Sequence, residues 1–408
     1  MHIRKNAASL TDQEWEKFMG AVIALKHSFA PGSNISVYDQ FVAIHWGVTQ
    51  LTGAQTRNGG HGGPAFLAWH REYIRRFEAA LRSVDPEVTL PYWNWALGEL
   101  ADTTSLFRDE RIGPMGNGGA SALAVDSGYL ALSPNRFHSL GWSINADLRQ
   151  LRFGFAPEGN ALERNTTLDT GALPTASQVN GVLMAPDFST FRPGLESAHN
   201  TIHILLGRDM STMTSPNDLI FFLHHCQVDR LWAKWQKNHP GTANYNPLGT
   251  GGRGHRLNDL MWPWDGRASQ TTVTGLAAFL PTFAATDQVR CRDVVDHHSL
   301  EYCYDDEPGC PCGMDEEEMP TRPLAENIPT TLRFGEEGRP VTTLALGEEG
   351  RPVTTLPLGE EGTPVTTLAL GEEGTPITIV ENGPLTAAEN APDVVNPNPF
   401  GRFPGGNR

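Results

Sequence analysis

The chain has 408 residues, enough for two or three domains, and 39% of them are hydrophobic, as in a packed globular protein. Its formal net charge is −16, of which −13 falls in residues 305–408, where 19 acidic side chains outnumber 6 basic ones. A near-neutral body with an acidic tail excludes non-specific binding to nucleic acid, because such binding needs a basic surface. No run reaches the roughly 18 apolar residues of a membrane helix, so we expect no membrane partner.

The N-terminus and the cysteines indicate the compartment. The first residues include basic side chains but no apolar stretch after them, so they do not resemble a signal peptide. The cysteines are few and odd in number: Cys226, Cys291, Cys303, Cys310 and Cys312. We therefore expect no disulfide scaffold and a reducing, cytoplasmic environment.

Apolar residues recur at helical spacing in five segments, which predicts a mainly α fold with helices over residues 10–26, 37–51, 66–81, 196–206 and 218–237. Thr11, followed by Glu14, has the pattern of a capping box at the first of these helices. The sequences between the helices are rich in Gly, Pro, Asn and Ser. We expect a helical bundle whose long loops shape the functional site.

Composition changes abruptly after residue 304. We divide the chain into a helical domain (1–304), an acidic linker (305–329), repeats (330–380) and a disordered tail (381–408). Each 12-residue repeat reads TTL, two variable residues, GEEG and then a Pro. The alternating VTTLAL segments favour short β-hairpins with Gly-Glu-Glu-Gly turns, although isolated hairpins are marginal in water.

Histidines form two groups in the helical domain. In HGGPAFLAWHREYIRRFE, residues 61–78, His61 and His70 are nine residues apart. Glycines on both sides of His61 allow a loop to direct its ring toward the helix that carries His70. His45 lies upstream on its own amphipathic segment, so the first group has three imidazoles.

The second group begins in LESAHNTIHILLG, residues 195–207, where His199 and His203 share one helical face at i and i+4. The pair His224-His225 follows in the next predicted helix. An i,i+4 pair alone is weak evidence and also fits zinc, but no Glu directly follows the first His as in HExxH. Three imidazoles per group suit copper and leave positions open for dioxygen.

Both groups, together with their flanking residues, resemble the copper-A and copper-B signatures of the tyrosinase and polyphenol oxidase family. The first block matches through His61, Phe66, Trp69, His70, Arg71 and Glu78, and the second through His199, Asn200, His203, Asn217, Asp218, Phe221, His225, Asp229 and Trp232. The resemblance implies two copper ions per chain, bound by His45, His61, His70, His199, His203 and His225. His224 is then a neighbour, because the family uses the second histidine of the pair.

The resemblance also implies a dicopper site inside the helical bundle and an activity. Members of the family oxidise monophenols and o-diphenols to o-quinones with dioxygen, which makes a phenolic small molecule the expected substrate and a copper chaperone an expected partner. In the family, a Glu before the first copper-B histidine and an Asn after it hold a water near the metals. Glu196 and Asn200 are therefore the candidate catalytic residues. A helix-start acid and a helix-capping or ligand-orienting amide are the alternatives for these two side chains.

Three further positions carry expectations. Asp229 either orients a ligand imidazole or pairs with an arginine, against the alternative of a surface charge. In the segment 211–215, Thr212 and Met213 stand where a bulky Phe would block the metals, which favours access for monophenols. Gly59 occupies the position where plant and fungal members often have a thioether-bonded Cys, so no thioether forms here.

The tail has a resemblance of its own. Its paired threonines and paired glutamates are similar to the core repeats of graspetides of the plesiocin type, in which an ATP-grasp ligase joins Thr hydroxyls to Glu carboxyls as esters. This resemblance implies such a ligase as a partner. Members of the oxidase family often cover their site with a separate domain, so the tail is also a candidate inhibitor. Cys310 and Cys312 either pass Cu(I) to the site or are ordinary linker residues.

Other functions share some of these features. A catechol oxidase or an o-aminophenol oxidase without activity on monophenols would use the same ligands. A haemocyanin-like oxygen carrier would use a similar site without turnover. A structural or matrix protein would account for the acidic repeats but would leave the six histidines unexplained.

Overall fold

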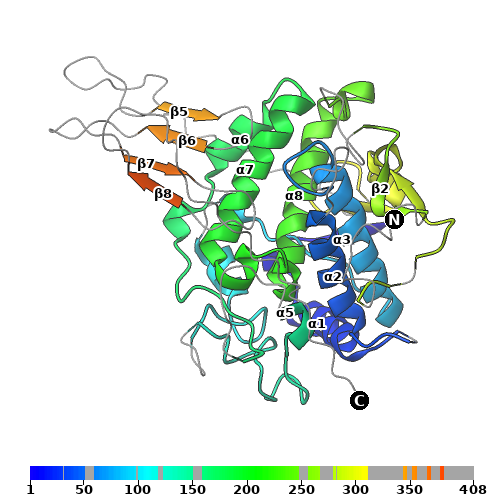
Figure 1. Cartoon of the computed structure of the whole chain (residues 1–408), viewed down its shortest axis with the longest axis vertical. Coiled ribbons are helices and arrows are strands. Elements are labelled where there is room, and N and C mark those ends of the chain that lie inside the picture. The colour runs from blue at the N-terminus through cyan, green and yellow to red at the C-terminus, as the bar shows by residue number, and fades with distance from the viewer. Residues whose placement is uncertain are drawn as a thin grey trace, which may run out of the picture.

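The computed structural model describes residues 1–30, 32–50, 59–97, 100–117, 123–149, 159–247, 256–266, 279–281 and 283–310, together with four strands between residues 343 and 380. Helices dominate the described residues up to Cys310, as the periodicity predicts, and Figure 1 shows them gathered into one bundle. Among the described helices, none is long and apolar enough to cross a membrane.

Five long helices form the bundle: α1 (Asp12–His27), α2 (Val37–Thr49), α3 (Ala65–Val84), α7 (Phe188–Leu206) and α8 (Ile220–Lys237). α3 packs along α8, α1 packs on both α2 and α3, and α7 contacts α3 and α8. In Figure 1, α8 lies between α7 on one side and α2 and α3 on the other. Aromatic side chains fill the interface of α3 and α8, where the rings of Phe77 and Phe222 stack 3.6 Å apart.

The start of α1 follows the capping-box prediction. The Thr11 hydroxyl accepts the backbone N–H of Glu14 at 3.2 Å, and the Glu14 carboxylate accepts the backbone N–H of Thr11 at 2.8 Å. These bonds satisfy two N–H groups that a helix otherwise leaves without partners. The buried face of the helix then packs against its neighbours through Trp15, Phe18 and Val22.

α7 begins at Phe188, so the prediction of a helix starting near residue 196 was wrong. Pro193 lies inside the helix, where it cannot donate a backbone hydrogen bond. The helix nevertheless forms because the Asp187 side chain accepts the Thr190 N–H at 2.8 Å. Burial of Phe188 and Phe191 further offsets the loss, and the extra turns carry the residues that precede Glu196.

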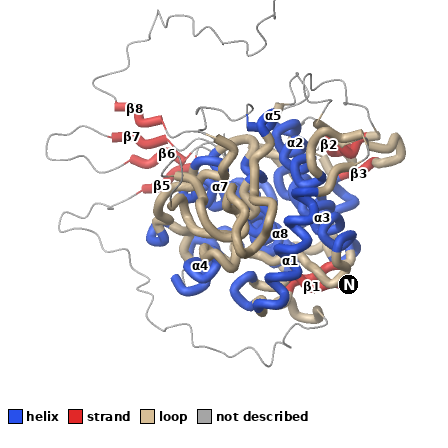
Figure 2. The backbone as a smooth tube through the Cα atoms, turned by 90° about the horizontal axis from the view of Figure 1, so that it is seen from below, coloured by secondary structure: helices blue, strands red, loops and turns tan. Residues whose placement is uncertain are grey.

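Shorter helices interrupt the regions that the sequence assigned to loops. They are α4 (Leu100–Leu106), α5 (Ala146–Arg149) and α6 (Ala176–Leu183), and single turns of 3-10 helix occur at Ala7–Ser9, Trp95–Leu97, Thr170–Ala172, Arg208–Ser211, Ser215–Asn217, Gly241–Asn244, Cys291–Val294 and His298–Leu300. Long loops, drawn in tan in Figure 2, connect them. These elements are too short to show a helical period in the sequence.

Two small two-stranded sheets accompany the helices of the core. β1 (His2–Arg4) pairs in parallel with β4 (Tyr302–Tyr304), and β2 (Leu260–Asp265) pairs antiparallel with β3 (Gln288–Arg290). Because β1 is N-terminal and β4 lies close to the end of the core, their pairing closes the bundle. Figure 2 shows β1 beside the marked N-terminus.

Asp229 is the centre of a buried ionic network beneath this closure. Its carboxylate accepts hydrogen bonds from Arg71, from Arg4 at 3.1 Å and from the Tyr302 hydroxyl at 2.6 Å. The Tyr304 hydroxyl donates to the same carboxylate. Of the alternatives for Asp229, the structure therefore confirms the pairing with arginine, and the residue is buried.

One disulfide joins Cys303 to Cys310, although the few, odd-numbered cysteines led us to expect no disulfide scaffold. β4 and the turn that follows it bring the two Cα atoms to 5.9 Å, within the range that a disulfide spans. Cys310 consequently has no thiol with which to pass Cu(I), and Cys312 lies outside the described residues. The packed core also continues to Cys310, six residues beyond the expected boundary at residue 304.

The repeats contribute four described strands, β5 (Thr343–Leu346), β6 (Pro352–Thr355), β7 (Val365–Leu368) and β8 (Ile377–Val380). They pair antiparallel in sequence order, as a run of hairpins would. The register places Thr354 opposite Thr367 and Thr343 opposite Thr355. The glutamate pairs of the repeats, the linker 311–329 and the tail from residue 381 lie outside the described residues.

Candidate metal centre

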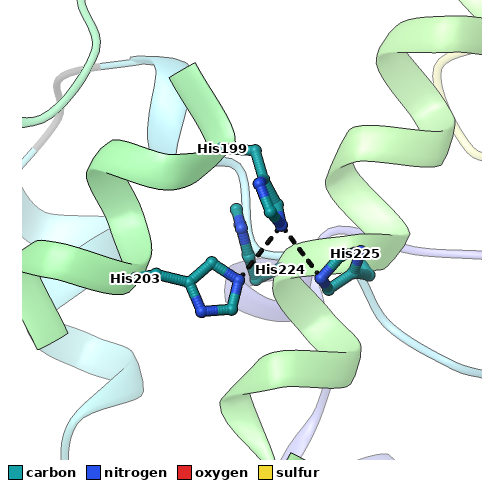
Figure 3. A group of neighbouring side chains, drawn as sticks. All are labelled: His199, His203, His224 and His225. Atoms are coloured by element: carbon teal, nitrogen blue, oxygen red, sulfur yellow. Dashed lines mark hydrogen bonds between the residues drawn. The ribbon is translucent and has the colours of Figure 1, made fainter. Parts of the chain in front are cut away.

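Three histidines of the second group converge on one point, as Figure 3 shows. α7 carries His199 and His203 one turn apart, and α8 supplies His225 from the facing helix. The Nε2 atom of His199 lies 3.1 Å from Nε2 of His203 and 3.1 Å from Nε2 of His225. Nitrogens bound to a first-row metal at about 2.0–2.1 Å have this separation when they subtend about 100°.

Hydrogen bonds at the opposite ring nitrogens fix the tautomers of this group. Nδ1 of His203 lies 2.6 Å from the carbonyl oxygen of Met210, and Nδ1 of His199 lies 3.0 Å from Oδ1 of Asn200. Both partners are acceptors, so each Nδ1 carries the proton and each Nε2 presents a lone pair. The 3.1 Å contact between the two Nε2 atoms therefore brings lone pairs together, an arrangement that a bound cation stabilises.

His224 lies beside these three histidines but takes no part in the Nε2 contacts that join them. Its ring stacks on the ring of His199, with centroids 4.7 Å apart and planes at 14°, and it lies 5.1 Å from the ring of His203. Its ligand atoms fall within the same cluster as those of His199, His203 and His225. In Figure 3, however, the dashed lines between Nε2 atoms join His199 to His203 and to His225, and none reaches His224.

The first group consists of His45 on α2, His61 on the loop before α3, and His70 on α3. Their ligand atoms lie within 4.8 Å of one another, and ring centroids are 5.0 Å apart for His45 and His61 and 4.8 Å apart for His61 and His70. Nδ1 of His70 donates to the Phe66 carbonyl at 2.8 Å, and Nδ1 of His45 donates to the Met213 carbonyl at 2.9 Å. Both bonds again leave Nε2 as the ligand atom.

Glycines shape the loop that carries His61, as the sequence predicts. Gly62 has a φ of +64°, a conformation that residues with a Cβ rarely adopt. A Cβ atom on Gly60 would lie 3.1 Å from the Val48 side chain and 3.2 Å from the Trp69 ring, so glycine permits this close approach. The loop thereby holds His61 against α2 and α3.

Burial makes the histidines competent ligands. It lowers the pKa of His45 to about 4 and that of His203 to about 3, although a hydrogen bond to a carbonyl partly opposes the shift in each. Burial and neighbouring imidazoles lower the pKa well below 6.5 for the remaining members, His61, His70, His199, His224 and His225. The rings are therefore neutral near pH 7, the state that binds a metal ion.

The structure also places the two candidate catalytic residues beside the histidines. Glu196 is buried, and its carboxylate accepts the N–H of Gly62 at 2.6 Å and a bond from Arg192 one turn earlier. Burial raises the pKa of Glu196, while Arg192 and the Gly62 N–H oppose that rise. Asn200 acts on His199 through the bond described above, which is the ligand-orienting alternative for this amide.

Sequence reasoning missed some of the groups that hold the site. The carbonyls of Met210 and Met213 orient His203 and His45, but a backbone carbonyl leaves no signature in a sequence. Arg192 could have been found, because it stands four residues before Glu196 on one helix. Thr212 proves to be buried and bonded to Asp209, whereas Met213 is half-buried.

Known proteins resemble this chain in sequence and in fold. The common central domain of tyrosinase matches residues 35–238. A tyrosinase of Streptomyces glaucescens is 36% identical over 281 residues, which cover 65% of this chain and 93% of that protein. The grixazone synthase of Streptomyces griseus is 31% identical over 306 residues, covering 65% and 94%. A polyphenol oxidase variant from Thermothelomyces thermophila has the same fold, with a TM-score of 0.54, 22% identity and coverage of 74% and 88%.

The matched segment contains both histidine groups, and their donor set fits copper. Each group offers at least three neutral imidazoles in a buried cluster, and imidazole is a good ligand for this metal. The chain therefore belongs to the tyrosinase family, and it is a tyrosinase-type polyphenol oxidase that binds two copper ions and oxidises phenols.

Proposed function

We propose that the chain hydroxylates monophenols and oxidises o-diphenols to o-quinones, with one copper ion held by His45, His61 and His70 and the other by His199, His203 and His225. The single observation that carries the ligand assignment is the convergence of three Nε2 atoms at 3.1 Å in the second group. The homologous tyrosinase from Streptomyces glaucescens supports the activity.

The copper pair, when bound, supplies the redox chemistry with dioxygen. The protein holds the ligand rings in fixed orientations through hydrogen bonds from their Nδ1–H groups to Met210, Met213 and Phe66. Because these bonds are to backbone carbonyls of packed segments, the rings cannot turn without breaking them. Such preorganisation keeps each Nε2 directed at the centre.

We assign Glu196, through a water that its carboxylate polarises, to the deprotonation of the phenol, and Asn200 to the orientation of the ligand His199. A phenol has a pKa of about 10, so a base assists its ionisation near neutral pH. The buried carboxylate of Glu196 has a raised pKa, which makes it a stronger base than an exposed glutamate. Asn200 acts in this proposal by accepting a hydrogen bond through its Oδ1 from Nδ1 of His199, at 3.0 Å. His199 lies three residues after Glu196 on the same helix.

Oxygen uptake by the purified, copper-loaded chain tests this function. We expect consumption of dioxygen with tyrosine, catechol and 2-aminophenol. Uptake with catechol alone would make the chain a catechol oxidase, and uptake with 2-aminophenol alone would make it an o-aminophenol oxidase. Reversible oxygen binding without turnover of any phenol would contradict enzymatic function and favour a haemocyanin-like carrier.

Copper delivery by a chaperone is part of the proposal. Five of the six proposed ligands are buried, and His61 is the half-buried member of the set. A protein partner that presents copper beside the His61 loop would accelerate loading. Comparing loading by free copper ions with loading from a cell extract tests this, and complete, rapid loading by free ions would argue against a chaperone.

We also propose that residues 330–380 form a domain that an ATP-grasp ligase modifies. The support is the antiparallel pairing of β5 to β8, whose register sets Thr354 opposite Thr367. A hairpin of this kind returns the chain on itself, which sets threonines of neighbouring units opposite one another. Ester formation releases one water for each Thr–Glu link, so the intact mass of protein from its native host decides the question. An unmodified mass would end the proposal.

A further inference from the structure

A second place in the core gathers metal-binding side chains, and it is separate from both histidine groups described above. His297 and His298 begin the last 3-10 turn of the core, and Glu307 follows β4. Nε2 of His297 lies 2.9 Å from Oε2 of Glu307 and 3.1 Å from Oε1, and Nε2 of His298 lies 2.9 Å from Oε1. Two imidazole nitrogens are thus directed at one carboxylate.

We propose that His297, His298 and Glu307 form a third metal site, for a divalent first-row ion of the zinc type. Two imidazoles and a carboxylate are an established ligand set for such ions. Ligand atoms on a tetrahedral ion with bonds of about 2.1 Å are about 3.4 Å apart. The nitrogens and oxygens lie 2.9–3.1 Å apart as hydrogen-bonded partners, so an ion that takes the place of the shared protons needs them to separate by only roughly 0.4 Å.

The surroundings preorganise the three ligands. His297 is buried, and its ring packs 5.5 Å from the ring of Tyr302 and 6.1 Å from that of Tyr304. The Tyr304 N–H donates to Oε2 of Glu307 at 3.3 Å, which holds the carboxylate in place. His298 is 47% exposed and provides the route by which an ion enters from solvent.

Neighbouring charges leave Glu307 available to the histidines. A hollow of about 200 Å³ beside it is lined by the cations Arg230, Lys234 and Lys237. Arg230 and Lys234 pair with Asp306 instead of with Glu307. The Asp296 carboxylate lies 3.6 Å from Nδ1 of His298, on the side of the ring opposite Glu307. A carboxylate in that position raises the basicity of a ligand imidazole.

The site would strengthen the end of the core. It links the turn at His298–Leu300 to the segment between β4 and Cys310. An ion that binds only the folded state stabilises it by mass action. A third ion would therefore reinforce the same junction that the Cys303–Cys310 disulfide closes.

Calorimetric titration of the copper-loaded chain with Zn²⁺ tests the proposal. Zinc does not displace copper from imidazole sites, because copper binds such sites more tightly. We expect one equivalent of Zn²⁺ to bind and to raise the melting temperature. His298→Gln and Glu307→Gln should each weaken binding at least tenfold and abolish the rise, while both variants keep their two copper ions.

The matched control is His138→Gln, which removes a half-buried histidine whose nitrogens bond to the Tyr129 carbonyl and the Gly141 N–H. This variant should bind Zn²⁺ as the unaltered chain does. Absence of a zinc equivalent in the unaltered chain would overturn the proposal. So would undiminished zinc binding in both His298→Gln and Glu307→Gln. Because the readouts are zinc stoichiometry and melting temperature, neither result depends on oxidation of a phenol.

Discussion

The rings of His70 and His225 stack with centroids 4.1 Å apart and planes at 13°, and this contact joins the two histidine groups. His70 belongs to α3 and His225 to α8, the two helices that pack along each other. The Phe66 ring contacts His70 and His199, and the Phe221 ring contacts His45 and His225. Each phenylalanine therefore packs against both histidine groups. The separation of the two metal positions is thus set by packing between α3 and α8.

The ligand assignment predicts different outcomes for two adjacent histidines. His225→Gln should remove one of the two copper ions and lower the rate of phenol oxidation at least a hundredfold. This loss exceeds the roughly 10- to 100-fold loss expected when a residue that only hydrogen-bonds to a ligand is replaced. His224→Gln should keep both ions, because its ring stacks on His199 outside the Nε2 contacts. Metal analysis with oxygen uptake checks both variants. A copper loss confined to His224→Gln would reverse the assignment.

Ligands in the first group and in α7 should behave like His225. His70→Ala and His203→Ala each remove an imidazole whose tautomer is fixed by a backbone carbonyl. We expect each variant to lose copper and to be inactive. Full copper content together with full activity in either variant would refute the site.

Glu196→Gln distinguishes catalysis from structure. If the carboxylate deprotonates the phenol, monophenol oxidation should fall about a hundredfold, within the range for loss of a general base. Oxidation of o-diphenols, which ionise more readily, should fall less than about tenfold. Rates with tyrosine and catechol at equal copper content measure the ratio. Equal losses on both substrates would indicate that Glu196 only holds Arg192 and the Gly62 loop.

The buried pair of Arg4 and Glu78 predicts how stability depends on pH. Burial would raise the pKa of Glu78, but Arg4 and His2 outweigh it and lower the pKa to about 2. The folded-state pKa lies below the unfolded value of 4.5, so this stability is present above pH 4.5 and is lost as pH falls toward 2. The loss amounts to about 3 kcal/mol for a shift of this size.

Glu78→Gln should remove that pH dependence and destabilise the chain by about 3 kcal/mol near pH 7, because the buried Arg4 charge then keeps only Asp229, which Arg71 also pairs with. Urea unfolding of both proteins between pH 7 and pH 3 measures the difference. Parallel pH profiles for the two proteins would show that Glu78 does not supply this dependence.

Removal of residues 314–408 tests the relation of the tail to the site. In the described part of the chain, the C-terminal end of the core is held by the Cys303–Cys310 disulfide and by Asp305, which accepts hydrogen bonds from the Asn6 N–H and the Tyr92 hydroxyl. A chain that keeps these residues should fold, bind copper and oxidise phenols at least as fast as the full chain. Oxygen uptake at matched copper content checks this. A truncated chain that holds two copper ions without activity would show that the tail is required.

The long helices, the two histidine groups and the family could all be predicted from the order of the amino acids. Long segments such as α3 and α8 carry the strongest helical signal in the sequence: α3 buries one face, and α8 is buried over nearly all of its residues. The glycines around His61 and the i,i+4 spacing of His199 and His203 follow from local backbone geometry alone.

The groups that surround and orient the histidines could be identified only after folding brought distant segments together. The carbonyls of Met210 and Met213 come from irregular turns whose position depends on packing, and a carbonyl is present at every residue. The partners of Asp229, the disulfide between Cys303 and Cys310, and the meeting of His297 and His298 with Glu307 also required folding. These contacts join residues that are far apart in the chain. Their strength depends on interatomic distances, which are fixed only when the segments pack together.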